Sequence, residues 1–204
     1  MSSITEDETP RLPMPRWMLG LCWIATTSAG WAVGVGILPF LEPALEGRSP
    51  SWVWLRLPFI ILGLTIGSLQ VPCLPKGGRA RLLWVVGTSL GVCASFVFTD
   101  GELLKFALGG TLLGTLQWVV LRRSFTSAAW WIPASASGLV FSGRITLGAV
   151  MLADVDGRSS ASSIGIGALA GAVHGLATGM VWLQLTPKGT VSAQGGGDER
   201  TASA

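Results

Sequence analysis

Arg144 and His174 differ most in chemistry from the residues around them. Each lies within a long apolar stretch dominated by Leu, Val, Ala and Gly. A charge in the middle of a membrane helix costs at least ~2.5 kcal/mol on insertion scales, so it usually faces the bundle interior or a cavity. Together the two residues could form a polar site, in which Arg144 holds an anion or carboxylate and His174 carries a proton or acts as an axial ligand.

A structural role also accounts for both residues, and we favour it. Arg144 could bond to backbone carbonyl groups and to the hydroxyls of Ser142 and Thr146, with His174 capping that network. The long Arg144 side chain could instead extend toward Asp154 or the outer lipid headgroups.

Gln70 and Gln117 form a second candidate pair. Each follows a Gly-x3-Gly motif by three residues and lies about 8 Å from the basic edge of its apolar stretch, at 1.5 Å per helical residue. An amide there can bond across helices or to a headgroup, which is the role that we favour. Glutamine can also ligate a magnesium tetrapyrrole, but the sequence itself assigns no cofactor.

Signatures of catalysis are missing from the chain. Its single histidine excludes an HExxH motif, and no Walker A or nucleophile-elbow motif occurs. The cysteines Cys22, Cys73 and Cys93 lack CxxC or His-paired spacing, so we expect reduced thiols that serve in packing. The basic residues are spread between apolar runs rather than gathered in a patch. We therefore expect no enzyme, no metal site and no nucleic-acid partner.

The elements that must position these residues are membrane-spanning helices. Only 12% of the residues are charged, against about 25% in soluble domains. A span needs about 20 largely apolar residues, and a helix satisfies its own backbone groups in lipid. The apolar stretches that meet this requirement are 17–41, 52–74, 82–98, 103–121, 129–152 and 163–185.

An even number of spans places both termini on one side of the membrane. That side carries nine Lys and Arg residues and the opposite side carries four, which predicts cytoplasmic termini. We expect one membrane domain over residues 17–188. Residues 1–16 and 189–204 are expected to be disordered.

Small-residue motifs recur at matched positions along the spans. Every second span carries a glycine pair: Gly63 and Gly67, Gly110 and Gly114, Gly175 and Gly179. Nine residues after each pair comes a cation, which is Lys76, Arg123 or Lys188. The remaining spans carry a tryptophan seven residues before a glycine: Trp23 and Gly30, Trp84 and Gly91, Trp131 and Gly138.

These registers predict three tandem hairpins, at about 17–76, 82–123 and 129–188, in an all-α, polytopic six-helix bundle. Close contact through glycine would drive the packing of such helices in lipid. The alignment puts Trp182 in the place of Gln70 and Gln117. It aligns His174 with Leu62 and Gly109.

The run Gly-x3-Gly-x2-Gln-Trp-x2-Leu-Arg-Arg at 110–123, followed by Ala129-Trp130-Trp131, resembles uncharacterised multi-span membrane proteins of cyanobacteria and some other bacteria. The resemblance covers most of the chain. It implies a location in the cytoplasmic, or another inner, bacterial membrane. It implies no activity, and it transfers no catalytic residue.

The function that we expect is a scaffold or accessory subunit of a membrane complex. Its partners would be the lipid bilayer and either a membrane protein or a second copy of the chain. One alternative is a small transporter or channel lined by Arg144 and His174. A third is a pigment- or quinone-binding accessory protein that uses His174 or the glutamines. Pro58 and Pro133 lie near helix ends, so neither interrupts a span centrally, and this weakens the transport alternative.

Overall fold

The computed structural model describes residues 15–37, 39–41, 56–74, 77–95, 102–152 and 160–188, and these residues are mostly helical. The long helices are α1 (Arg16–Gly36), α4 (Leu57–Gln70), α5 (Gly78–Ala94), α6 (Glu102–Leu121), α7 (Trp131–Leu152) and α8 (Ser160–Gln184). Two 3-10 turns, η1 (Val71–Cys73) and η2 (Ala128–Trp130), follow α4 and precede α7. The predicted disordered termini, and loop residues such as Lys76, lie outside the described residues.

Two helices, α4 and α5, have ends that differ from the predicted spans. In α4, Pro58 lies in the first turn, where its missing N–H group has no helical partner to lose. The α-helix gives way to η1 at Pro72, because proline cannot donate to the preceding turn. α5 begins at Gly78, ahead of the predicted start at Leu82, because helical hydrogen bonding continues beyond the apolar stretch.

Three segments are long and apolar enough to cross a membrane by length and composition: Arg16–Leu41, Leu103–Leu121 and Ala161–Gln184. The apolar helical segment Leu57–Cys73 is shorter. The sequence-based expectation of spans is therefore supported most directly for α1, α6 and α8.

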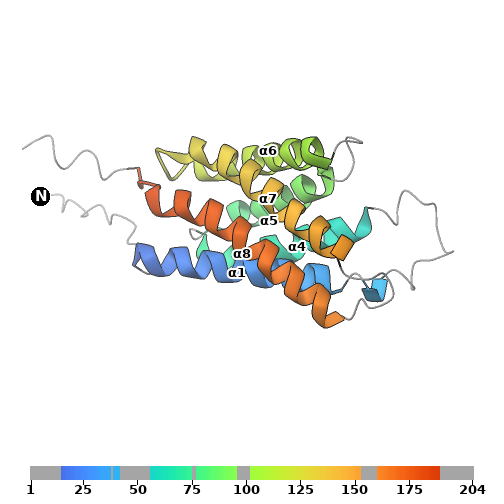
Figure 1. The fold of residues 1–204 in the computed structure, drawn as a ribbon. Helices are drawn as coiled ribbons and strands as arrows, with labels where there is room; N and C mark the ends of the chain where they lie inside the picture. Colours follow the sequence, from blue (N-terminus) through green and yellow to red (C-terminus); the bar gives the residue numbers. More distant parts are fainter. Residues whose placement is uncertain are drawn as a thin grey trace, which may run out of the picture.

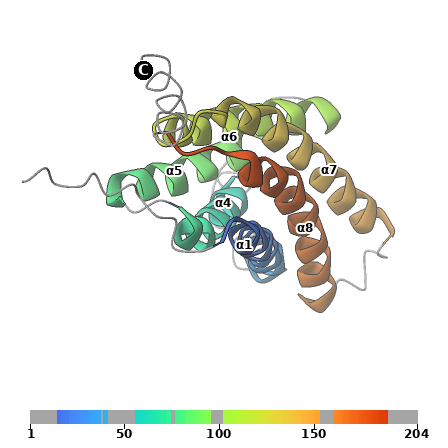
Figure 2. The same ribbon diagram turned by 90° about the vertical axis from the view of Figure 1, so that its left-hand side faces the viewer.

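The helices form a closed bundle, with their long axes roughly side by side (Figure 1). Each helix packs against the next one along the chain, and α1 also packs against α8. The view in Figure 2 shows α8 beside α1 at one side of the bundle and α7 next to α8. The first and last helices are therefore neighbours, and the bundle closes on itself.

The outside of the bundle is more apolar than the surface of a soluble protein, and polar side chains are buried inside it beside the apolar core. Large apolar side chains cover its outside, for example Leu21, Leu82, Leu90, Leu103 and Leu169, each more than half exposed. Among the described residues, the buried polar side chains are Thr27, Gln70, Thr88, Ser89, Ser95, Gln117, Ser135, Ser142, Ser163, His174 and Thr178. A soluble protein rarely exposes so much contiguous apolar surface, whereas a lipid-facing one requires it.

The segment between α6 and α7 is tied to the residues after α8. The Thr126 N–H donates to the Thr186 carbonyl at 3.0 Å, and the Lys188 N–H donates to the Ser124 carbonyl at 3.0 Å. The Lys188 ammonium also donates to the Arg122 carbonyl at 2.7 Å. These bonds hold together the ends of α6 and α8.

Candidate functional site

A cluster of tryptophans fills the centre of the bundle at the end where α1 begins. Trp23, Trp84 and Trp131 come from α1, α5 and α7, and each is less than 2% exposed. Their rings meet edge to face, with centroids 5.6 Å apart for Trp23–Trp84, 5.2 Å for Trp23–Trp131 and 5.8 Å for Trp84–Trp131. Trp182 of α8 stacks on Trp23 at 5.1 Å. Aromatic pairs prefer edge-to-face and stacked geometries such as these.

Gln70 links one of these indoles to the neighbouring helix. The Trp84 Nε1–H donates to the Gln70 Oε1 atom at 3.0 Å. The Gln70 Nε2 group donates to the Thr27 hydroxyl at 2.9 Å, and that hydroxyl donates to the Trp23 carbonyl at 2.8 Å. A single amide therefore joins α5, α4 and α1, and every group in the chain of bonds is buried.

Gln117 makes the same set of contacts between the next helices. The Trp131 Nε1–H donates to the Gln117 Oε1 atom at 2.7 Å. The Gln117 Nε2 group donates to the Thr88 hydroxyl at 3.0 Å, which donates to the Trp84 carbonyl at 2.8 Å. We call these two sets of bonds the glutamine relays: Trp84–Gln70–Thr27 and Trp131–Gln117–Thr88.

A third group of residues, Trp23, Thr178, His174 and Ser135, is arranged differently from the two relays. We call this group the third corner. The Trp23 Nε1–H donates to the Thr178 hydroxyl at 2.9 Å, and this hydroxyl donates to the His174 carbonyl at 2.8 Å. The Ser135 hydroxyl is buried and has no hydrogen-bond partner among the described residues. The network therefore stops at α8 and does not continue to α7.

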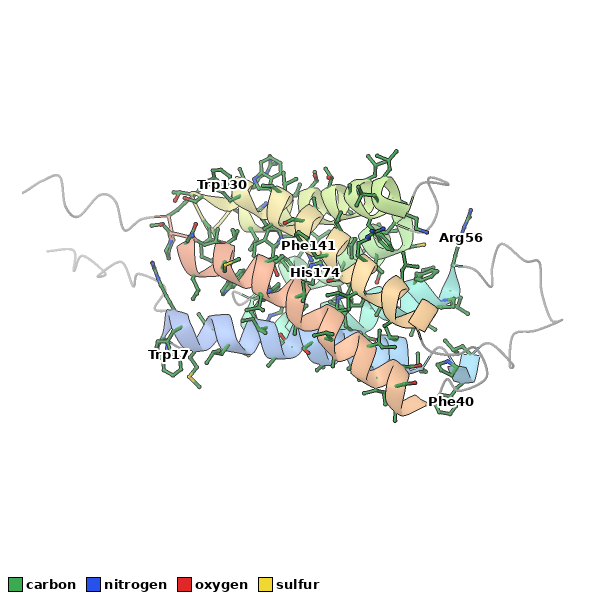
Figure 3. All side chains as sticks on the ribbon, viewed as in Figure 1. Trp17, Phe40, Arg56, Trp130, Phe141 and His174 are labelled. Carbon is green, nitrogen blue, oxygen red and sulfur yellow. The ribbon has the colours of Figure 1, made fainter. Side chains whose placement is uncertain are left out.

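His174 lies in the middle of α8 and points into the bundle (Figure 3). Its side chain is 6% exposed, and its Nδ1 atom lacks a hydrogen-bond partner within the part of the chain that the structure describes. Its ring packs near Trp31, at 6.3 Å between centroids, and against the backbone of Gly138. A buried, unpaired imidazole is the feature that stands out most in this half of the bundle.

Arg144 does not share a site with His174, contrary to the hypothesis of a joint polar site. Its side chain is exposed on α7. Trp130, Pro133, Ser137 and Phe141 are exposed on the same face at helical spacing, so Arg144 points outward. The predicted depth was compatible with a site, but depth does not determine the direction in which a helical residue points.

Ser142 and Thr146 are not partners of Arg144 either. The Ser142 hydroxyl donates to the Ala170 carbonyl at 2.7 Å, and the Thr146 hydroxyl donates to the Ser142 carbonyl at 2.9 Å. Arg144 lies in the half of α7 opposite the tryptophan cluster, eight residues before the last residue of the helix, Leu152. A long arginine side chain can extend along the helix surface toward lipid headgroups.

Several glycines lie where the backbone of a neighbouring helix approaches closely. A methyl group on Gly67 or Gly114 would meet the Cα atom of Val85 at 2.9 Å or of Ile132 at 2.8 Å. On α8, however, the residues in this position against α1 are Gly171 and Gly175. Methyl groups there would meet the Cα atoms of Ser28 at 2.7 Å and Ile24 at 3.0 Å. Gly179 makes only ordinary side-chain contacts, so Gly171 and Gly175, and not the aligned pair Gly175–Gly179, make the close approaches to α1.

Thr27, Thr88 and Thr178 are the site residues that sequence reasoning missed. Thr27 and Thr88 each follow a buried tryptophan by four residues, and this recurrence was a usable signal. Thr178 carried no such signal, because the residue four positions before it is His174 and the alignment matched Trp182 with the two glutamines.

The described residues contain no cluster of three or more His, Cys, Asp or Glu side chains that could hold a metal ion. Comparisons of the chain with protein-family models, curated proteins and solved structures find no match. The site must therefore be interpreted from its own chemistry.

Proposed function

We propose that this chain is an integral membrane protein with a structural role, as a scaffold or accessory subunit of a membrane complex, and that it performs no catalysis. The observation that carries this proposal is the tryptophan cluster with its two glutamine relays. The polar groups of the relays bond to one another across three helices each. Buried networks that are satisfied in this way rigidify a bundle.

The small size of one hollow beside the tryptophan cluster also favours a structural role over transport. It lies at the tryptophan end and is lined by Arg16, Leu19, Phe125, Trp182 and Leu185. Its volume is about 10 Å³, which is room for roughly one water molecule. A transport pathway would need to pass the stacked indoles of Trp23 and Trp182.

We further propose that the bundle consists of three tandem hairpins, α1–α4, α5–α6 and α7–α8. The contacts of the even helices support this arrangement. Gly63, Gly110 and Gly171 approach residues that follow a buried tryptophan by five positions: Ser89, Ala136 and Ser28. Gly67, Gly114 and Gly175 approach residues that follow the tryptophan directly: Val85, Ile132 and Ile24.

Contacts within each hairpin support the same register. Gly30, Gly91 and Gly138 face Ile66, Leu113 and His174, respectively. His174 thus takes the place of two buried aliphatic residues. The counterparts of Gln70 and Gln117 become Thr178, and Trp182 becomes the counterpart of the buried residues Leu74 and Leu121.

The orientation that we propose, with cytoplasmic termini, is supported by the aromatic and basic residues of the tryptophan end. Trp17 and Trp130 lie at this end and are 64% and 67% exposed, as expected for an interfacial belt (Figure 3). The Arg122 guanidinium lies over the Trp118 ring, 4.8 Å from its centroid. Basic residues concentrate on the cytoplasmic side of membrane proteins.

A small transporter or channel is the second candidate, favoured by the unpaired Nδ1 atom of His174. A buried histidine can bind and release a proton within a membrane pathway. Arg144 has no part in this candidate, because it faces away from the bundle.

Purification from the native host in a mild detergent, followed by reconstitution into liposomes, tests the proposal. We expect a membrane protein to copurify, a colourless preparation, and liposomes that exchange no more labelled solute than empty ones. Solute exchange that is lost in His174→Leu and kept in the matched variant Leu176→Ala, on the exposed face of α8, would establish the transporter instead. Visible absorption lost in His174→Leu would establish a pigment-binding protein.

A further inference from the structure

Two cysteines that are far apart in the sequence meet near the tryptophan end of the bundle. The Cys73 thiol donates to the Cys22 Sγ atom, with the two sulfur atoms 3.1 Å apart. Cys22 lies on α1, directly before Trp23, and Cys73 is the last residue of η1. The Thr26 hydroxyl lies 3.9 Å from the Cys73 sulfur.

Packing alone does not call for thiols at these positions. The residues that precede the other two buried tryptophans are Leu83 and Trp130, so a cysteine is not required before an indole. Disulfides need side chains that converge from backbones a few ångströms apart, and sulfur atoms already in contact meet the most restrictive part of that requirement.

The two thiols differ in their exposure to an oxidant. Cys22 is half-buried, whereas Cys73 is 5% exposed and lies behind it. Both lie close to the basic end of the bundle, since Cys22 is six residues from Arg16, or about 9 Å along the helix. A small, membrane-permeant oxidant that enters from that interface would meet Cys22 first.

We propose that Cys22 and Cys73 are an oxidative modification site, at which a peroxide converts the thiol pair into a reversible disulfide that joins α1 to the end of α4. The Cys22 sulfur attacks one peroxide oxygen and the O–O bond breaks, which leaves a sulfenic acid and one water molecule. The Cys73 sulfur then attacks the Cys22 sulfur, the S–O bond breaks, and the departing hydroxide takes the Cys73 proton as a second water molecule. Two thiols lose two electrons, and the peroxide is reduced to water.

The bond would join residues 22 and 73, so that the chain between them becomes a covalently closed ring that includes the residues between α1 and α4. Because disulfides on the cytoplasmic side are usually transient and redox-sensing, a dithiol reductant would restore the pair. The modification would restrain α1 against η1 without moving the tryptophan cluster.

Peptide mapping of the full chain in native membranes tests this site, with Cys93 as the internal control. Trypsin cuts after Lys and Arg, so Cys22, Cys73 and Cys93 fall on separate peptides, 17–48, 57–76 and 82–105. Membranes are treated with hydrogen peroxide, free thiols are blocked with a maleimide, and the peptides are identified by mass spectrometry. Cys93 is half-buried on α5, so it reports on oxidation without a partner thiol.

We expect a product that links 17–48 to 57–76, is reversed by dithiothreitol, and is about tenfold more abundant than any product containing 82–105, because disulfide geometry is restrictive. It should persist in Cys93→Ser and disappear in Cys22→Ser and Cys73→Ser. The proposal is overturned if links to Cys93 are equally abundant, if both thiols remain open to the maleimide, or if Cys22 is oxidised to a sulfinic acid without any link to Cys73.

Discussion

The two glutamine relays and the third corner solve the same packing problem with different side chains. In each relay, one amide receives an indole N–H and donates to a threonine on the far helix. In the third corner, the Thr178 hydroxyl receives the indole N–H of Trp23 but donates to its own helix, at the His174 carbonyl. The relays therefore connect three helices each, and the third corner connects only two.

This difference explains why the third corner contains unpaired polar atoms. A threonine is too short to span the distance that a glutamine amide spans, so the Ser135 hydroxyl on α7 lacks the bond that Thr27 and Thr88 receive. His174 adds a second unpaired atom, at a position whose proposed counterparts are Ile66 and Leu113. The third corner thus contains two buried polar atoms without a bond, and substitution there can improve the bundle.

Removal of a tryptophan that belongs to a relay should have the largest effect. Trp131 is fully buried and contacts Trp23, Trp84 and Trp182. We expect Trp131→Ala to lower the free energy of unfolding by about 4 kcal/mol, because it leaves a large cavity. Equilibrium unfolding in mixed micelles measures this. The neighbouring variant Trp130→Ala, on the exposed face, should change stability by less than about 0.5 kcal/mol. Equal losses in both variants would contradict the central role of the cluster.

Replacing a relay glutamine by an apolar residue of similar volume should have the next largest effect. Gln117→Leu leaves the Trp131 N–H buried without an acceptor, and we expect a loss of about 2 kcal/mol. The same unfolding measurement applies, with Gln184→Leu at an exposed position of α8 as the matched control. A loss no larger than the control's would mean that the relay adds nothing to stability.

Completing the third corner should stabilise the protein. If the proposed register is correct, Thr178→Gln keeps an acceptor for Trp23 and brings an amide donor toward Ser135. We expect a gain of about 1 kcal/mol, as for one added hydrogen bond. Thr111→Gln, on the exposed face of α6, should leave stability unchanged. The register would be contradicted if Thr178→Gln destabilises the protein and if adding Ser135→Thr to that variant leaves the loss of stability unchanged.

Exchanging His174 for its proposed counterpart should have the smallest effect. We expect His174→Leu to change stability by less than about 1 kcal/mol, in the stabilising direction, because an unpaired buried nitrogen is removed. The reciprocal variant Leu113→His should destabilise by roughly 2 kcal/mol, because it buries an unpaired polar group. Thermal unfolding followed by tryptophan fluorescence compares the two. A loss of several kcal/mol in His174→Leu would show that the histidine has a partner.

Hydropathy predicted the helices well, because apolar runs long enough to span a bilayer leave few other structures open to the chain. The register of α8 was harder to predict. Gly171, Gly175 and Gly179 follow one another at intervals of four, so a glycine pair fits in two ways. Only the contacts with Ser28 and Ile24 on α1 distinguish the two possible alignments. The three evenly spaced glycines therefore do not fix the alignment by themselves.

The direction of Arg144 could not be predicted for a related reason. Nearly all the residues of α7 around Arg144 are apolar or small, so no polar stripe marks an inner or an outer face. His174 could be assigned to the interior only once Gly138 was known to lie against it. The composition of these segments predicted that they form apolar helices. The rotation of each helix about its own axis depends on contacts with helices from distant parts of the chain.

The closure of the bundle between α1 and α8 also constrains how the protein is made. The acceptor of the Trp23 indole lies 155 residues further along the chain, so α1 lacks this partner until the ribosome has synthesised Thr178. The hairpin α5–α6 can meanwhile assemble from local contacts, which form sooner than distant ones. A circularly permuted chain that begins at α5 and joins α8 to α1 by a short linker would bring these partners together early. In this permuted chain, α1 should therefore be less exposed to quality-control proteases during insertion.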